Sequence, residues 1–195
     1  MVNLIRKAIN KTGLDLHKYR PKIDRLAWLF EHNIQTVIDI GANVGQFADE
    51  IRNELPNAFI YSFEPLRDCF EKLRKREIND RKFKSFNFAL GEKETTANIN
   101  RSSYSLSSSL LTMAESHKTL FPHTKDSVPE TIGVKRLDDV FRELKIEKEI
   151  LIKVDTQGYE DKVMAGGTNI FSVARVTIIE ASFIRLYENQ PLFDD

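Results

Sequence analysis

Residues 36–47, TVIDIGANVGQF, constrain the fold more than any other part of the chain. The stretch begins with apolar or β-branched residues, interrupted by Asp39, and continues into two glycines, Gly41 and Gly45. Beyond the glycines, apolar residues recur at helical spacing as far as Glu54. This pattern predicts a strand, a tight turn and a helix, in that order.

A glycine-containing turn before a helix is suited to ligand binding. Glycine lets a ligand approach the main chain, and the helix N-terminus offers unpaired N–H groups. A dinucleotide fingerprint needs the pattern GxGxxG, but Asn43 and Gln46 occupy the second and third glycine positions. The acid at Asp39 favours a ligand with an ammonium group or hydroxyls over one with phosphates. Alternatively, Gly41 and Gly45 only shape the corner between strand and helix.

Composition limits the class of protein. A chain of 195 residues with 41% hydrophobic and 30% charged residues fits one globular domain. Because 29 basic residues balance 29 acidic ones, we expect no nucleic-acid partner. The lone cysteine, Cys69, is typical of a reducing compartment, so we expect a cytoplasmic protein. No apolar segment approaches the roughly 20 residues that a transmembrane helix needs.

The rest of the chain predicts alternating strands and helices. Short apolar or alternating runs indicate further strands at residues 59–64, 83–88, 150–155 and 176–180. This alternation predicts an α/β fold with a doubly wound, mostly parallel, Rossmann-like sheet. It breaks at residues 92–135, where two short strands flank a serine-rich stretch. We interpret that part as an insertion that covers the substrate side.

Four acidic residues, Asp39, Glu64, Asp155 and Glu180, stand at or near the ends of predicted strands. Because parallel strands end at one edge of a sheet, we expect these acids on one rim. Glu64 lies about 20 residues after the glycine turn, where an acid accepts hydrogen bonds from ribose hydroxyls. Strand alternation places Lys153 on the same face as Asp155. Taken singly, each acid also has a structural interpretation, as a helix cap or an ion-pair partner.

Several motifs together resemble the FkbM family of S-adenosylmethionine-dependent methyltransferases. They are VIDIGANVGQF at 37–47, FEP at 63–65, ALG at 89–91, SSSL at 107–110 and LIKVDTQGYE at 151–160. The last motif is the most specific. The resemblance implies a seven-stranded class I methyltransferase fold and methylation of a hydroxyl on a sugar or secondary metabolite. We therefore expect a methyltransferase domain at 36–195 with an insertion at 92–135, and packed N-terminal helices at 1–35.

The resemblance and the strand positions together imply roles in binding S-adenosylmethionine. The glycine turn would approach the methionine moiety and Asp39 its ammonium group, while Glu64 would hold the ribose hydroxyls. Ala89 and Leu90 would flank the adenine. The expected cofactor-binding residues are Asp39, Gly41, Asn43, Gly45, Phe47, Glu64, Pro65, Ala89, Leu90 and Asp155.

Asp155 is the candidate catalytic base, or the group that orients the acceptor. Lys153 would tune it, and Glu160 and Glu180 would support it. The serines at 107–109, Ser107, Ser108 and Ser109, would bind a small hydroxylated acceptor. We expect no resident metal; in the alternative, Asp155 and Glu180 hold a hard cation such as Mg²⁺.

Family members usually continue beyond the position of Glu180 into a helix and a final strand pair, but this chain ends at Asp195. We therefore expect a sheet that lacks the C-terminal β-hairpin and whose open edge pairs with a second copy of the chain. Two other function classes compete: a non-catalytic member that binds a cofactor or partner, and a nicotinamide-dependent reductase. Asn43 and Gln46 count against the reductase.

Overall fold

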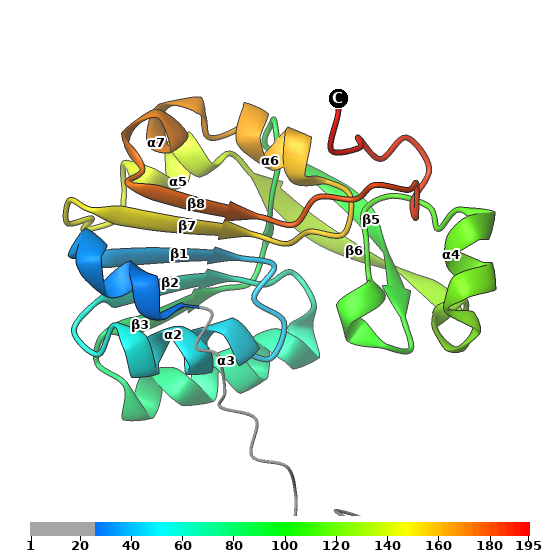
Figure 1. Cartoon of the computed structure of the whole chain (residues 1–195). Helices are drawn as coiled ribbons and strands as arrows, with labels where there is room; N and C mark the ends of the chain where they lie inside the picture. Colours follow the sequence, from blue (N-terminus) through cyan, green and yellow to red (C-terminus); the bar gives the residue numbers. More distant parts are fainter. Residues whose placement is uncertain (1–25) are drawn as a thin grey trace, which may run out of the picture.

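The centre of the fold is a parallel sheet with the strand order β3-β2-β1-β7-β8 (Figure 1). The computed structural model of the chain describes residues 26–195. The strands are β1 (Thr36–Ile40), β2 (Phe59–Phe63), β3 (Phe83–Phe86), β7 (Ile150–Val154) and β8 (Val176–Ile179). The predicted strands are confirmed, and the strand order reverses between β1 and β7, as in a doubly wound sheet.

Helices cover both faces of this sheet (Figure 1). One face carries α2 (Gln46–Glu54) and α3 (Arg67–Asn79), whose buried Ile51 and Leu73 pack in one cluster with Val37 of β1. The other face carries α5 (Leu137–Phe141), α6 (Glu160–Ala165) and α7 (Thr168–Val173), which pack with Ile38 and Ile40. Because successive side chains of β1 point to opposite faces, this one strand contributes to both clusters.

The predicted insertion forms a second sheet beside the strand ends of the first (Figure 1). Its order is β4-β6-β5, and β5 pairs with β6 antiparallel. The elements are β4 (Ala89–Leu90), β5 (Thr95–Ser102), η2 (Ser105–Ser107), α4 (Glu115–Leu120), η3 (Pro122–Thr124) and β6 (Ser127–Lys135). The two predicted strands are confirmed and run longer than expected. Ala89 and Leu90 belong to this second sheet instead of extending β3.

The region before β1 differs from the prediction. The apolar spacing predicts a helix with Leu26 and Phe30 on its buried stripe. The structure has a short 3-10 helix, η1 (Ala27–His32), in which Leu29 is buried and Phe30 is 76% exposed. A 3-10 helix has three residues per turn, so a stripe with α-helical spacing does not stay on one face. The helices predicted for residues 1–25 lie outside the described residues.

Beyond β8 the chain crosses to the insertion (Figure 1). Main-chain bonds join Ala114 N to Leu186 O and Glu188 N to Thr112 O, and Tyr187 is buried there. Within the described residues the central sheet has five strands instead of the seven implied by the resemblance, and β8 is an edge strand. Pairing of that edge with a second copy stays a prediction. No helix in the described part of the chain is long and apolar enough to cross a membrane.

Candidate functional site

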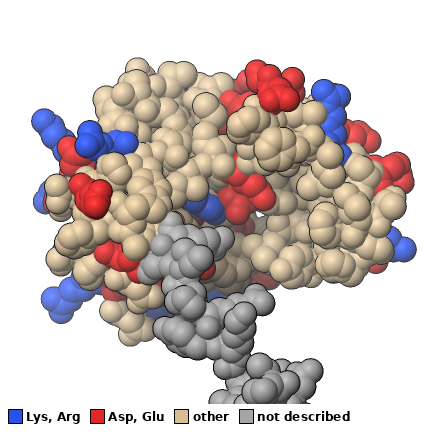
Figure 2. All heavy atoms as spheres, viewed as in Figure 1, with Lys and Arg blue, Asp and Glu red and all other residues tan. Residues whose placement is uncertain are grey.

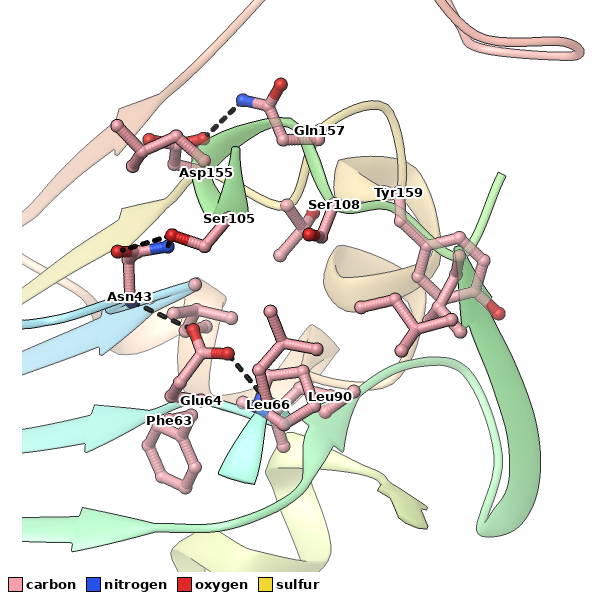
Figure 3. Close-up of a pocket in the computed structure, with 18 residues that line it drawn as sticks. Asn43, Phe63, Glu64, Leu66, Leu90, Ser105, Ser108, Asp155, Gln157 and Tyr159 are labelled. Atoms are coloured by element: carbon pink, nitrogen blue, oxygen red, sulfur yellow. Dashed lines mark hydrogen bonds between the residues drawn. The ribbon is translucent and has the colours of Figure 1, made fainter. Parts of the chain in front are cut away.

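A cavity of about 620 Å³, counting the space at its open mouth, lies where β1, β2 and β7 end (Figure 3). The insertion closes one side of it, with Ser105, Ser108 and Leu110 among its lining residues. The position is the point where the strand order reverses, which is where ligands bind in doubly wound sheets. The walls are mainly apolar with a few polar groups, the usual character of a small-molecule site.

Glu64 follows β2 directly and lines this cavity. Its Oε2 accepts the main-chain N–H of Asn43 and its Oε1 that of Leu66, both at 2.8 Å (Figure 3). Only 4% of Glu64 is exposed. Burial raises the pKa of its carboxyl to about 7, although the two N–H bonds oppose this rise. Each oxygen keeps a lone pair, so the carboxyl can bind a ligand hydroxyl.

The two turn glycines are required by contacts within the chain. Gly41 has φ +75°, and a Cβ there would lie 1.8 Å from the main-chain oxygen of Asp155. Gly45 has φ +95°, and its Cβ would meet the side chains of Leu73 and Arg76. The structure therefore supports the alternative that these glycines shape the corner. Gly41 still lines the cavity, whereas Gly45 does not.

Asn43 also lies in the turn, and it connects the turn to the insertion. It adopts a positive φ of 48°, and its Nδ2 donates to Ser105 Oγ at 3.0 Å (Figure 3). Pro65, Ala89 and Leu90 line the cavity as the resemblance implies. Ser105 also lines the cavity; it lies in the serine-rich stretch but outside the three serines assigned to the acceptor.

Asp39 does not reach the cavity: it is fully buried in the sheet, and its carboxylate faces Lys153. Lys153 Nζ lies 3.4 Å from Asp39 Oδ1 and 3.5 Å from Asp155 Oδ2, and it donates to Gly41 O at 3.1 Å. Burial raises the pKa of Asp39 despite the attraction of Lys153. Burial alone would lower the pKa of Lys153, but the attraction of the two carboxylates is larger, so its pKa lies above the usual value. The ammonium group expected near Asp39 is thus supplied by the chain itself.

Asp155 and Glu180 follow β7 and β8 and share one hydrogen-bond donor. Gln157 Nε2 donates to Asp155 Oδ1 at 2.9 Å and to Glu180 Oε2 at 2.7 Å. Burial raises the pKa of Asp155, but Lys153 and the hydrogen bonds outweigh it, so the net pKa is lowered. Partial burial and the neighbouring Asp155 raise the pKa of Glu180 to about 8. Near neutral pH the two acids therefore titrate as a pair, in which Lys153 favours the negative charge on Asp155.

Asp155 lies where three hollows meet. It lines the main cavity and two neighbouring hollows, one of about 890 Å³ and one of about 590 Å³, that also expose Phe47 and Lys153. Figure 2 shows acidic and basic side chains side by side at the middle of this face. Phe47 contacts these two hollows instead of the main cavity, and Lys153 Nζ lies 5.8 Å from the centre of its ring.

Glu160 supports the turn after Asp155 and does not line the cavity. Its Oε1 accepts the N–H groups of Thr156 at 2.8 Å and Gly158 at 3.2 Å, and the hydroxyl of Thr156 at 3.1 Å. These bonds hold Gln157 and Gly158 in left-handed conformations, with φ of 57° and 97°. The catalytic supporting role predicted for Glu160 stays a prediction.

Of the three serines predicted to bind the acceptor, only Ser108 lines the cavity. Its Oγ accepts the N–H of Ser102 at 3.1 Å. Ser109 is buried and donates to Gln157 O at 2.6 Å, while Ser107 O accepts from Tyr187 at 3.1 Å. Ser107 and Ser109 therefore bond to other parts of the chain and hold the insertion against the turn after β7 and the C-terminal segment. The run of serines in one loop indicated a polar surface there, but it did not show which of the serines would face the cavity.

Gln157 and Tyr187 were missed by the sequence reasoning. Only the position of Gln157 within the motif at 151–160 indicated a functional role, and no motif includes Tyr187. Among residues 26–195, no three His, Cys, Asp or Glu side chains are grouped so that they could hold a metal ion. Asp155 and Glu180 are bridged by the Gln157 amide in this arrangement.

The chain is similar in sequence to known methyltransferases. The Methyltransferase FkbM domain model matches residues 39–195. The 2-O-methyltransferase NoeI of Sinorhizobium fredii is 27% identical over 169 residues, covering 83% of this chain and 69% of that protein. Methyltransferase sdnD of Sordaria araneosa is 27% identical over 161 residues, covering 67% of this chain and 59% of that protein.

A solved structure of an FkbM methyltransferase from Methylobacillus flagellatus shares the fold, with a TM-score of 0.51 and 16% sequence identity. The similarity covers 76% of this chain and 33% of that one, so the chain spans about a third of the solved protein's length. The family model covers the turn, the acidic rim and the insertion together. The chain belongs to the FkbM methyltransferase family.

Proposed function

We propose that the chain transfers a methyl group from S-adenosylmethionine to a hydroxyl oxygen of a small sugar or secondary metabolite. The observation that carries this proposal is the buried carboxyl of Glu64 on the wall of a mainly apolar cavity at the reversal of strand order. Family membership supports methyl transfer, and the relative named as a 2-O-methyltransferase supports oxygen as the accepting atom.

The residues of the cavity fit an adenosyl group. Leu66, Ala89 and Leu90 supply apolar wall for an adenine ring, and Glu64 supplies a hydrogen-bond acceptor for ribose hydroxyls. Asn43 would lie beside the methionine moiety. When bound, this donor supplies a methyl group on a positively charged sulfur, which is ready for in-line displacement.

Asp155 would take up the proton that the acceptor loses. Its pKa is lowered, and its carboxylate borders both the donor cavity and the neighbouring hollows. With the donor bound, the acceptor oxygen would take the methyl group from the sulfur, which would keep the electron pair of the broken S–C bond, and the hydroxyl proton would pass to Asp155. Lys153 holds the carboxylate at 3.5 Å and so limits its motion. A positioned base of this kind contributes about 10²- to 10⁴-fold in rate.

Two measurements test the proposal. In calorimetric titration, S-adenosylmethionine should bind saturably and NADH should not, and Glu64→Ala should abolish binding. With radiolabelled donor and a panel of hydroxylated glycosides, Asp155→Asn should lower turnover about 10²- to 10⁴-fold with unchanged donor affinity. Asp139→Asn, at a partly exposed acid on α5, is the matched control. NADH binding, or full turnover by Asp155→Asn, would contradict the proposal.

A further inference from the structure

The side-chain amide of Gln157 uses both its hydrogens and its oxygen. Its Nε2 donates to Asp155 at 2.9 Å and to Glu180 at 2.7 Å, and its Oε1 accepts the hydroxyl of Tyr187 at 3.0 Å. An amide NH₂ group has two hydrogens, and each has its own carboxylate. A flipped amide would direct its oxygen at both acids, so these partners determine the orientation of Gln157.

The backbone of Gln157 is also held tightly. Its φ of 57° is uncommon for a residue other than glycine. Glu160 binds the N–H groups on either side of Gln157, those of Thr156 and Gly158, and Ser109 donates to the Gln157 carbonyl at 2.6 Å. The surrounding residues therefore maintain a conformation that costs free energy, as is often seen at functional sites.

Tyr187 connects this amide to the far end of the chain. The residue comes from the segment after β8, yet it is only 1% exposed. Its hydroxyl lies 3.1 Å from Ser107 O as well as 3.0 Å from Gln157 Oε1, and its ring packs against His117. The insertion, the turn after β7 and the C-terminal segment thus meet at one side chain.

We propose that Gln157 is a positioning residue, which holds Asp155 and Glu180 in one arrangement for taking up the acceptor's proton, and that Tyr187 orients its amide. This inference rests on the proposed function. Gln157 itself neither gains nor loses a proton, and the acceptor's proton passes to Asp155. Because the amide donates to both acids, it favours the charged form of each, and Lys153 beside Asp155 strengthens that preference at Asp155.

Other charged and titratable groups face the acid pair and also affect the pKa values of Asp155 and Glu180. Lys153 and Asp39 approach from the sheet, and Glu160 from the helix after the turn. Glu50 of α2 lines the same hollow as the pair. The Gln157 bonds lower the pKa of Asp155 together with Lys153. A test therefore has to compare variants that leave these neighbours unchanged.

Carboxyl ¹³C NMR titration of the full chain, labelled at Asp and Glu, provides a readout that needs no substrate. In Gln157→Leu, the Asp155 carboxyl should titrate at a higher pH than in the wild type, because a donor to its charged form is lost. Gln157→Asn keeps the amide and tolerates the left-handed backbone but is one methylene too short, so it should shift in the same direction. Tyr187→Phe should give a smaller shift, and Gln35→Leu, at an exposed glutamine, should give none.

Turnover on an acceptor found with the glycoside panel should fall about tenfold or more in Gln157→Leu, since a bond to a charged group is lost. Unchanged Asp155 and Glu180 titrations in the folded Leu and Asn variants would overturn the inference. The two proposals fail separately. If S-adenosylmethionine does not bind but the titrations shift, the proposed function fails and the positioning of the pair stands. If methyl transfer occurs with unshifted titrations, only the positioning role fails.

Discussion

Replacing Glu64 by glutamine should change how the stability of the protein depends on pH. The pKa of this buried carboxyl is raised from 4.5 to about 7. Between these pH values the folded chain binds a proton that the unfolded chain releases. The stabilisation from this proton is therefore fully present below about pH 4.5 and is lost as the pH rises through about 7. At about 1.4 kcal/mol for each pH unit, the loss is roughly 3 kcal/mol.

Glutamine is neutral at every pH and has nearly the same shape as a protonated Glu64. In acid the variant should be less stable than the wild type by about 1 to 3 kcal/mol, because its NH₂ group cannot accept one of the two main-chain N–H bonds that Glu64 accepts. Above about pH 8 this deficit should have shrunk by roughly 3 kcal/mol, since the variant buries no charge. Its affinity for S-adenosylmethionine should fall about tenfold or more, because an amide has one acceptor oxygen instead of two.

Urea unfolding followed by circular dichroism at about pH 5 and about pH 8.5 measures the difference between the two chains. Taking the difference removes the contributions of other titrating groups. Glu71→Gln on α3 is the matched control, because Glu71 is partly exposed and its ion pair with Arg67 spans 3.6 Å. Its effect should stay within about 0.5 kcal/mol at both pH values. A difference between wild type and Glu64→Gln that does not change with pH would refute the reasoning.

Two further substitutions test the turns around the site. Gly41→Ala should destabilise the protein by about 2 to 5 kcal/mol, because a Cβ would lie 1.8 Å from Asp155 O at a positive φ; an unchanged melting temperature would contradict this. Glu160→Ala should cost about 1 to 3 kcal/mol, because the N–H groups of Thr156 and Gly158 would lose the oxygen that accepts from both, and it should lower turnover by loosening Gln157. Chemical denaturation measures the loss of stability, and an assay with radiolabelled donor measures the loss of turnover. A variant with unchanged stability and activity would show that the turn after β7 keeps its conformation without Glu160.

The fold was largely predictable because its signals are local. Periodicity and glycine punctuation indicated the strands and their alternation with helices, and the acids after β2, β7 and β8 could be placed on one rim. The prediction failed at Phe30, where α-helical spacing did not reveal that a 3-10 helix forms. It also missed α7, a helix of one or two turns that follows Gly167.

The site was predictable only in part, because side-chain partners depend on distant segments. Glu64 and Asp155, which the sequence predicts as site residues, both line the cavity. Asp39 was predicted to face a ligand, but it is paired with Lys153 across neighbouring strands. Ser107 and Ser109 were predicted to face the acceptor, but they hold the cover of the site from within.

The sequence by itself determined the strand–turn–helix unit and the acids that follow β2, β7 and β8, since each depends on the residues next to it in the chain, and the order of the motifs indicated the family. Only the tertiary structure decided that Gly41 makes room for Asp155 O and that Gln157 joins Asp155, Glu180 and Tyr187. The reason is physical. Local periodicity reflects which face of an element is buried, whereas hydrogen-bond partners 23 to 30 residues apart meet only when several elements pack together.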